Sequence, residues 1–379
     1  MSRQRSLAMI AALGLAGAAA LGISQEVVRP PQDGRTLAAR MDWAHKEASR
    51  RSFLDGYWTG YSIRRLMGKK STIGSYDSEA RFKPTLRQVI DGQKSVDPAS
   101  ANQGTVQEKA RHILDDLEKE GQPEKKVWKD VAILFRNGNR AGDGGERVRL
   151  GNLDQAIDLE GLPLIWLGEA EDEESLSWLK EKYQKAETEK MKEPLLVAIG
   201  IHQSPSLVIP ILASILESRE PDALRKSAAF WLGQQNDGKA YDILMRTADK
   251  DPSREVRESA VFALSQLEIE ESVDGLIGLA RRATHEDVRH QAIFWLGQKA
   301  SAKATATLET LAYESGEMKI QEQAVFALSQ LPGNEGVDAL IKVVKTHPGA
   351  GIRKKAIFWL GETGDPRALE VLVEIVKGK

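Results

Sequence analysis

Few residues of this sequence could carry out chemistry, and they do not form a recognisable catalytic motif. The chain has six histidines and no cysteine. It contains no G-x-S-x-G nucleophile motif. The Gly-rich stretch GDGGER (142–147) lies between two predicted strands, so it favours a hairpin turn over a phosphate-binding loop. We therefore predict no catalytic residue, no metal site and no cofactor.

A row of basic residues recurs at one position of the sequence. Each member follows a branched or linear aliphatic residue, and the row consists of Arg225, Arg257, Arg289 and Arg353, with Gln321 breaking it and Lys354 adding charge at its end. A structural interpretation is that each side chain bonds a carbonyl end or an acid of the adjacent repeat. A functional interpretation is that the cations line one face at the spacing of packed helices, roughly 8–10 Å, and bind acidic segments of a partner.

A second row is aromatic and recurs in the same register. Its members stand 32 residues apart, at Phe230, Phe262, Phe294, Phe326 and Phe358. Tryptophan follows at 231, 295 and 359, and alanine takes that place at 263 and 327. Alternation of large and small side chains suits packing between layers, so we expect the tryptophans in the core. The phenylalanines lie off the centre of the apolar stripe and are the better candidates for partner contact.

Both rows belong to an internal repeat of 32 residues, which predicts pairs of helices. From Leu224 the apolar positions 224, 228, 231 and 232 form the stripe of an amphipathic helix. A second helix follows a short turn such as Gly364-Asp365-Pro366, in which the Asp suits an N-cap and the Pro the first turn. Such pairs bury their apolar faces only by stacking, so we predict an α-solenoid of about six units over residues 190–379.

The repeat pattern resembles a known family. The sequence [VI]-R-x-x-A-x-[FW]-x-L-G, a turn such as G-D-P, and then A-L-x-x-L is similar to HEAT-like repeats of the phycobilisome-lyase type. That resemblance implies the fold, whereas function has to be argued from the site. The deoxyhypusine hydroxylases, which are also helical-repeat proteins, bind iron with several His-Glu pairs. This chain has one such pair, His285-Glu286, which we interpret as a solvated helix start.

The region before the array lacks the repeat and predicts a small α+β domain over residues 25–160. We expect a helix within 35–53, a strand over 55–65, a helix over 106–119 capped by Thr105 and Glu108, and a hairpin of 131–136 with 146–153. These strands would form a short antiparallel sheet. Residues 161–189 are expected to be a transition, because LIWLGEAEDEESLSWL (164–179) resembles a degenerate copy of the repeat. The acidic run 169–175 suits the first turn of a helix.

Residues 35–70 are basic and aromatic. They hold nine Lys or Arg against three acids, with Tyr57, Trp58 and Tyr61 interleaved. This composition is compatible with nucleic acid, anionic lipid, an acidic polymer or a protein. A solvated helix face explains it equally well.

The N-terminus predicts export. Arg3 and Arg5 precede an uncharged apolar run from Leu7 to Ile23, and small residues follow where a signal peptidase could cut. We expect residues 1–24 to be a signal peptide and the protein to be periplasmic or secreted. The alternative is an anchor in the inner membrane formed by residues 7–23. The lack of cysteine means that no disulfide or lipid-modified Cys can contribute.

These features favour a binding protein over an enzyme. The net charge of −2 gives no bulk attraction to nucleic acid, so a protein partner is expected. Our first hypothesis is a non-catalytic scaffold or adaptor of the bacterial envelope. The alternatives are an enzyme or enzyme subunit with its activity in the N-terminal domain, and a membrane-anchored regulator.

Overall fold

The computed structural model describes residues 25–31, 34–53, 55–74, 84–92, 125–138, 147–299 and 301–377. The chain divides into two compact units, with the division between Lys185 and Ala186. Each unit has its own hydrophobic core and is described by itself.

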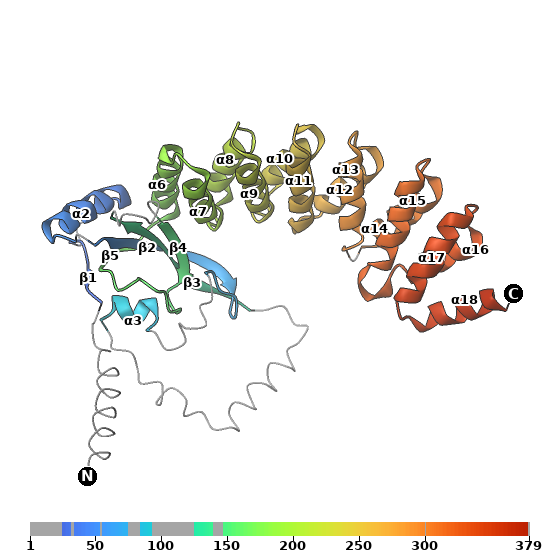
Figure 1. Ribbon diagram of the computed structural model, residues 1–379, viewed down its shortest axis with the longest axis horizontal. Helices are drawn as coiled ribbons and strands as arrows, with labels where there is room; N and C mark the ends of the chain where they lie inside the picture. The colour runs from blue at the N-terminus through green and yellow to red at the C-terminus, as the bar shows by residue number, and fades with distance from the viewer. Residues whose placement is uncertain are drawn as a thin grey trace, which may run out of the picture. The chain divides into compact units, whose positions relative to one another are not determined.

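The first unit is an α+β fold built on one mixed sheet. Among the described residues, the sheet has five strands in the order β1-β5-β2-β3-β4. β2, β3 and β4 are antiparallel neighbours, whereas β5 runs parallel to both β1 and β2. The elements are β1 (Val27–Val28), α2 (Leu37–Arg50), β2 (Tyr57–Gly68), α3 (Leu86–Ile90), β3 (Lys126–Asn137), β4 (Arg147–Asn152), β5 (Leu164–Glu169) and α6 (Asp172–Lys185) (Figure 1).

Both faces of this sheet are buried. On one face Trp58, Leu134 and Trp166 pack with Leu86 and Ile90 of α3. On the other face the rings of Tyr61 and Phe135 meet Trp178 of α6. The alternation of side chains along β2 and β3 sends successive aromatic residues to opposite layers. Consequently Trp58 and Tyr61, which the sequence left open as contact residues, are core residues, and Tyr57 is also buried.

Most elements expected in this unit are confirmed. The helix within 35–53, the strand at 55–65 and the antiparallel pairing of 131–136 with 146–153 correspond to α2, β2 and the β3–β4 pair. The acidic first turn of α6 is also confirmed, with Asp172, Glu173 and Glu174. The expected helix over 106–119 and most of the turn at 142–147 lie outside the described residues.

The segment LIWLGE was misread as part of a repeat helix. It forms β5, and Leu164, Ile165, Trp166 and Leu167 are all buried because the strand lies between two neighbours. A short continuous apolar run is compatible with a buried helix or a buried strand, so periodicity could not decide. Because β5 pairs in parallel with β1 and β2, the sheet is mixed and not purely antiparallel.

The second unit is the predicted α-solenoid. From residue 189 to 377 the described chain forms six helix pairs that stack in sequence order (Figure 1). The first helices of the pairs are α7 (Glu189–Gly200), α9 (Asp222–Gly233), α11 (Arg254–Gln266), α13 (Glu286–Leu296), α15 (Met318–Ser329) and α17 (Ala350–Glu362). The second helices are α8 (Pro205–Leu216), α10 (Gly238–Lys250), α12 (Glu271–Arg282), α14 (Ala302–Glu314), α16 (Val337–Thr346) and α18 (Pro366–Val376), with a 3-10 turn η2 (Pro332–Asn334) before α16.

The repeated apolar phases form the core of this unit. Two sets of apolar residues that recur every 32 positions are buried throughout. One set is Leu224, Val256, Val288, Ile320 and Ile352, and the other is Leu244, Leu276, Leu308 and Leu340. Asp365 caps α18 by accepting a hydrogen bond from the Arg367 amide, with Pro366 in the first turn as predicted.

Glycine allows successive first helices to approach closely. A Cβ placed on Gly233 would lie 2.7 Å from the carbonyl oxygen of Ala263, and one on Gly297 would lie 2.7 Å from that of Ala327. The glycine of an FWLG copy therefore leaves room for the backbone and side chain of the alanine in the next FALS copy. This contact explains why the repeat has a 64-residue doublet.

No helix of the described residues is long and apolar enough to cross a membrane. The apolar run 7–23 lies outside those residues.

Candidate interaction surfaces

The recurring arginines cap the preceding helix pair. Arg257 donates from Nη1 to the carbonyl oxygen of Asp251, at 2.9 Å. Asp251 is the C-cap residue of α10. The last carbonyls of a helix lack intrahelical donors and carry the negative end of the helix dipole, so a cation there is stabilising. Arg289, Gln321 and Arg353 make the equivalent bond to the C-cap carbonyls of α12, α14 and α16, at 2.8, 2.8 and 2.6 Å.

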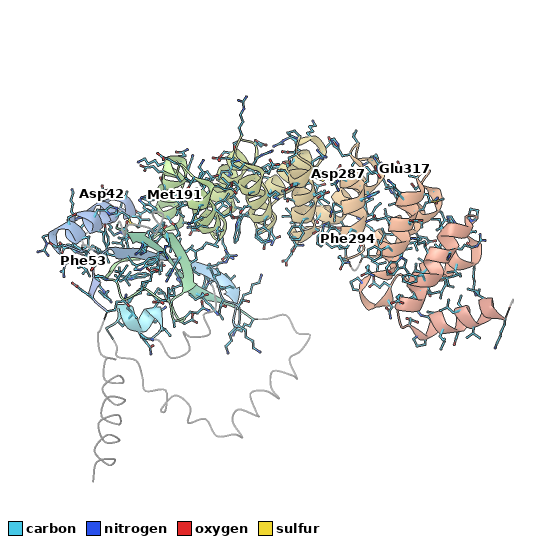
Figure 2. The ribbon with its side chains drawn as sticks, in the orientation of Figure 1. Asp42, Phe53, Met191, Asp287, Phe294 and Glu317 are labelled. Carbon is cyan, nitrogen blue, oxygen red and sulfur yellow. The ribbon has the colours of Figure 1, made fainter. Side chains whose placement is uncertain are left out.

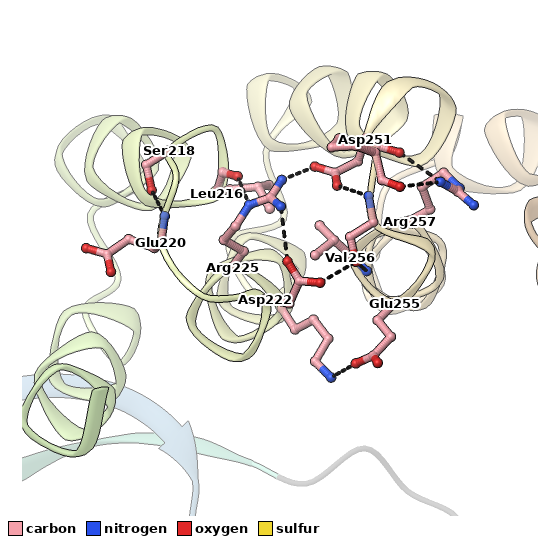
Figure 3. Close-up of polar contacts among 12 residues, drawn as sticks. Leu216, Ser218, Glu220, Asp222, Arg225, Asp251, Glu255, Val256 and Arg257 are labelled. Carbon is pink, nitrogen blue, oxygen red and sulfur yellow. Dashed lines mark hydrogen bonds and ion pairs between the residues drawn. The ribbon is translucent and has the colours of Figure 1, made fainter. Parts of the chain in front are cut away.

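Three of the arginines, Arg225, Arg257 and Arg289, also form an ion pair with an acid. Arg257 forms a bidentate pair with Asp287, with nitrogen–oxygen distances of 3.0 and 3.1 Å. Arg289 pairs with Glu317 at 3.1 Å, and Arg225 pairs with Asp251. Figure 3 shows Asp251 between the two arginines, with its carboxylate on Arg225 and its carbonyl facing Arg257. Each pair therefore joins one repeat to the next, which forms an arginine ladder.

The sequence alone did not identify these acids. Asp251, Asp287 and Glu317 fall at different positions of the 32-residue period, because Asp251 is the C-cap of α10, Asp287 lies in the first turn of α13 and Glu317 is the N-cap of α15. A search for acids in turns, without fixed register, would have found them. Arg225 and Arg257 are buried, so they offer no free cation to a partner. Lys354 at the end of the row is exposed, and binding of a partner by the row stays a prediction.

The aromatic row forms a surface feature of two ring groups, which we call the aromatic ridge. Phe262 stacks on Phe230 with ring centroids 6.3 Å apart and contacts Trp295 at 5.0 Å. Phe294 also contacts Trp295, at 5.0 Å. A second group follows further along, in which Trp359 lies 4.8 Å from Phe326 and 4.9 Å from Phe358. The ridge comprises Phe230, Trp231, Phe262, Phe294, Trp295, Phe326, Phe358 and Trp359.

The ridge is partly exposed to solvent. Phe230 is 38% and Phe358 57% exposed, and the other three phenylalanines are half-buried. The tryptophans are half-buried too, so their expected place in the core was only partly right. Large-against-small packing does occur, because the Trp231 ring lies where a Cβ on Gly200 would come within 2.2 Å. The Trp231 ring of α9 thus packs against α7 of the preceding repeat, while part of the ring stays exposed to solvent.

Ladder and ridge lie on different edges of the repeats. Figure 2 shows Asp287 and Glu317 along one edge and Phe294 along the opposite one. Asp287 stands in the first turn of α13, whereas Phe294 stands in its last. The contacts that stabilise the stack are therefore separate from the aromatic surface.

The remaining polar hollows hold paired charges. A groove of about 510 Å³ beside α12 and α14 is lined by Arg281, Arg282, Arg289, Glu314 and Glu317. A smaller one of about 230 Å³ lies in the first unit over Trp166, where Arg87 bonds Asp130 at 2.6 Å. Within the described part of the chain, no group of three or more His, Cys, Asp or Glu side chains could hold a metal ion. His285 is the N-cap of α13, and Glu286 pairs with Lys319 at 3.4 Å.

A family model for HEAT repeats matches residues 209–297, 273–357 and 305–379. Together these matches cover every helix pair from α9 to α18 and part of α8. No curated protein matches the sequence of this chain.

Several solved structures share the repeat fold at low similarity. Human deoxyhypusine hydroxylase in complex with glycerol is 20% identical, with 52% of this chain and 77% of that one covered and a TM-score of 0.24. The Escherichia coli protein YibA is 19% identical, with 53% and 75% covered and a TM-score of 0.33. The complex of CpcE and CpcF of phycocyanin lyase from Nostoc is 20% identical, with 53% and 80% covered and a TM-score of 0.31.

Proposed function

Because residues 209–379 are HEAT repeats, we propose that this chain is an exported scaffold that binds a protein partner along the aromatic ridge and catalyses no reaction. Solenoids of this kind present extended surfaces to macromolecular partners. The observation that supports the proposal is the ridge itself. Partly exposed aromatic rings, such as those of Phe230 and Phe358, are enriched at the energetic centres of protein interfaces.

The charges beside the ridge are balanced, which favours apolar recognition. One helical turn before each phenylalanine stands a charged or titratable residue, and the two lysines and two glutamates among them balance: Lys226, Glu258, His290, Glu322 and Lys354. Lys226 pairs with Glu255 at 2.5 Å, Glu258 with Arg254 at 2.8 Å, and Glu322 with Lys355 at 3.7 Å. A partner would therefore gain little from long-range charge and most from covering the rings.

Site-specific photo-crosslinking tests this proposal. A photoreactive phenylalanine analogue replaces Phe230, Phe294 or Phe358 in the full chain, expressed in its native host. The control places the same analogue at Leu207 of α8, an apolar residue that is 37% exposed and lies outside the ridge. We expect the three ridge positions to capture one common protein and position 207 to miss it. Equal capture at 207, or a different product at each ridge position, would refute the ridge as the binding surface.

Substitution gives an independent readout. A variant with Phe230→Ser, Phe294→Ser and Phe358→Ser should lose the partner, whereas Leu207→Ser should retain it. Circular dichroism melting of each variant shows whether the stack itself is intact. Retained binding in a folded triple variant would contradict the proposal.

Export rests on the N-terminal residues. Intact-mass measurement of the purified protein shows whether residues 1–24 are present, and detection of a chain that begins near residue 25 in the periplasm or medium would support a cleaved signal. A full-length chain in the inner-membrane fraction would favour the anchored regulator instead.

The enzyme alternative depends on the first unit. Its small hollow brings Asp130 and Glu169 near Trp166, but Asp130 bonds Arg87, as expected of a structural pair. If crosslinking at the ridge fails, a change in activity of the host extract on Asp130→Asn and Glu169→Gln would favour this alternative.

A further inference from the structure

β2 and β3 extend together into a two-stranded ribbon in the first unit. The pairing runs from Arg64 opposite Asp130 to Gly68 opposite Lys126, and the Lys69 amide then donates to the Lys125 carbonyl at 3.0 Å. We call residues 64–70 and 125–129 the basic ribbon. The two segments are 54 residues apart in the sequence, so only the fold brings them together.

The basic ribbon is strongly cationic. Its residues include seven Lys or Arg and no acid: Arg64, Arg65, Lys69, Lys70, Lys125, Lys126 and Lys129. Two acids flank residues 125–129 in the sequence: Glu124 lies outside the described residues, and Asp130 bonds Arg87 at 2.6 Å and lies opposite Arg64. Arg64, Lys69, Lys125 and Lys126 are exposed. Two anti-parallel strands therefore present positive charge at one place in a chain whose overall net charge is −2.

An exposed tryptophan lies within these cations. Trp128 stands opposite Leu66 and is 59% exposed, the largest ring so exposed among the described residues. The Arg64 guanidinium lies over it, 5.5 Å from the ring centroid. Lys129 fixes the end of the ribbon by donating to the carbonyl oxygens of Lys69 and Ser71, at 2.7 and 2.8 Å. The ring is thus held at the surface, flanked by charge.

We propose that the basic ribbon binds the surface of a membrane that contains anionic phospholipid. Lys and Arg are attracted to such a surface, and tryptophan is favoured at the headgroup level, where its ring is apolar and its N–H stays hydrated. The described part of the same unit begins at Gln25, two residues after the apolar run 7–23 ends, so a retained run would keep the ribbon near a bilayer. Single-stranded nucleic acid is the competing ligand, but Arg64 already covers one face of the ring on which a base would stack.

This proposal concerns a surface other than the aromatic ridge, so partner binding and lipid binding can fail independently. The test compares the full chain on phosphatidylglycerol vesicles and on neutral phosphatidylcholine vesicles, by flotation at low salt. Because the apolar run is common to all variants, the informative quantity is the ratio of the two partition coefficients.

We expect a ratio of about 100 or more for the wild type, decreasing as salt is added. The variant Lys69→Glu, Lys125→Glu, Lys126→Glu should lower that ratio at least ~100-fold, since each cation near the surface contributes about fivefold. The control reverses three exposed lysines outside the ribbon, as Lys180→Glu, Lys239→Glu and Lys250→Glu, and should retain the wild-type ratio.

Quenching by brominated lipid places the ring. Trp128→Phe should remove the component of tryptophan quenching that depends on phosphatidylglycerol. A wild-type ratio near one, or equal ratios in the ribbon and control variants, would overturn the proposal. So would tight binding of a single-stranded oligonucleotide without preference for anionic vesicles, which would assign the ribbon to nucleic acid.

Discussion

Substitution of Arg257 by alanine is the sharpest test of the arginine ladder. The side chain is 9% exposed and holds three groups at once: the Asp287 carboxylate, itself 12% exposed, and the carbonyl oxygens of Asp251 and Pro252. Arg257→Ala removes the donor to all three. It leaves a carboxylate in a site nearly closed to solvent and the end of α10 without its cap.

The expected cost follows from these groups. Removal of one partner from a buried pair costs about 3–5 kcal/mol, and a hydrogen bond to a charged group contributes about 1.5–3 kcal/mol. Because both side chains retain a tenth of their surface, water compensates in part. We expect Arg257→Ala to lower the free energy of unfolding by about 3 kcal/mol.

Urea unfolding followed by circular dichroism measures this loss, with Arg289→Ala as the matched control. Arg289 makes the same backbone bond, but its acid, Glu317, is 57% exposed and stays solvated when unpaired, so its loss should cost less, about 1.5 kcal/mol. The loss of unfolding free energy on Arg257→Gln should lie between those of Arg257→Ala and Arg289→Ala, because Gln321 shows that glutamine can still bond the C-cap carbonyl.

The double variant Arg257→Ala, Asp287→Ala isolates the unpaired charge. It should be more stable than Arg257→Ala alone, since no carboxylate is left without a partner. If Arg257→Ala changes the free energy of unfolding by less than about 0.5 kcal/mol, or if Arg289→Ala costs as much, the reasoning from burial is refuted.

Three further outcomes follow from the described contacts. Gly233→Ala should destabilise the stack by about 1–3 kcal/mol because its Cβ meets a carbonyl oxygen at 2.7 Å, whereas Gly361→Ala, whose nearest atom is 3.8 Å away, should be neutral or stabilise by up to about 1 kcal/mol; urea midpoints compare them. Hydrogen bonds from Arg367 lower the pKa of Asp365 from 3.8 to about 2. That contribution is present above pH 4 and lost as pH falls through 2, so the stability difference from Asp365→Asn should shrink over that interval in acid titrations. The combined variant Arg225→Glu, Arg257→Glu, Arg289→Glu reverses the charge of all three ladder cations and should unfold the array, as measured by circular dichroism. An unchanged melting curve would contradict the ladder.

The fold of the second unit could be predicted because its signal is repeated. The same apolar positions recur every 32 residues, so an apolar residue that occurs by chance in one copy does not change the pattern that the other copies share. The turn at Asp365 and Pro366 was predictable because capping depends on local residue types. The doublet was visible as alternating Trp and Ala, although its cause, the close seat at Gly233, required coordinates.

The first unit offered no such averaging. LIWLGE has the letters of the repeat but lies between two parallel strands, a pairing between segments more than 100 residues apart. The periodicity of apolar residues cannot show which distant strand a segment pairs with. The basic ribbon was missed for the same reason. Its cations at 64–70 were noticed, but Lys125, Lys126 and Trp128 join them only through the register of β2 with β3.

The two regular rows of the array divide two tasks that the sequence could not separate. A residue that recurs in each repeat is selected either because each joint needs it or because the surface it forms is continuous. The arginines satisfy the first condition, since Arg257, Arg289 and Arg353 each cap the end of the preceding helix, and Arg257 and Arg289 also bond an acid of the next repeat. The phenylalanines fit the second condition better: Phe230 and Phe358 are exposed, and Phe262 and Phe326 contact rings of a neighbouring repeat. Regularity in a solenoid therefore points to a binding surface only after the side chains that hold the stack have been assigned, and for this reason we propose the aromatic ridge and not the arginine ladder.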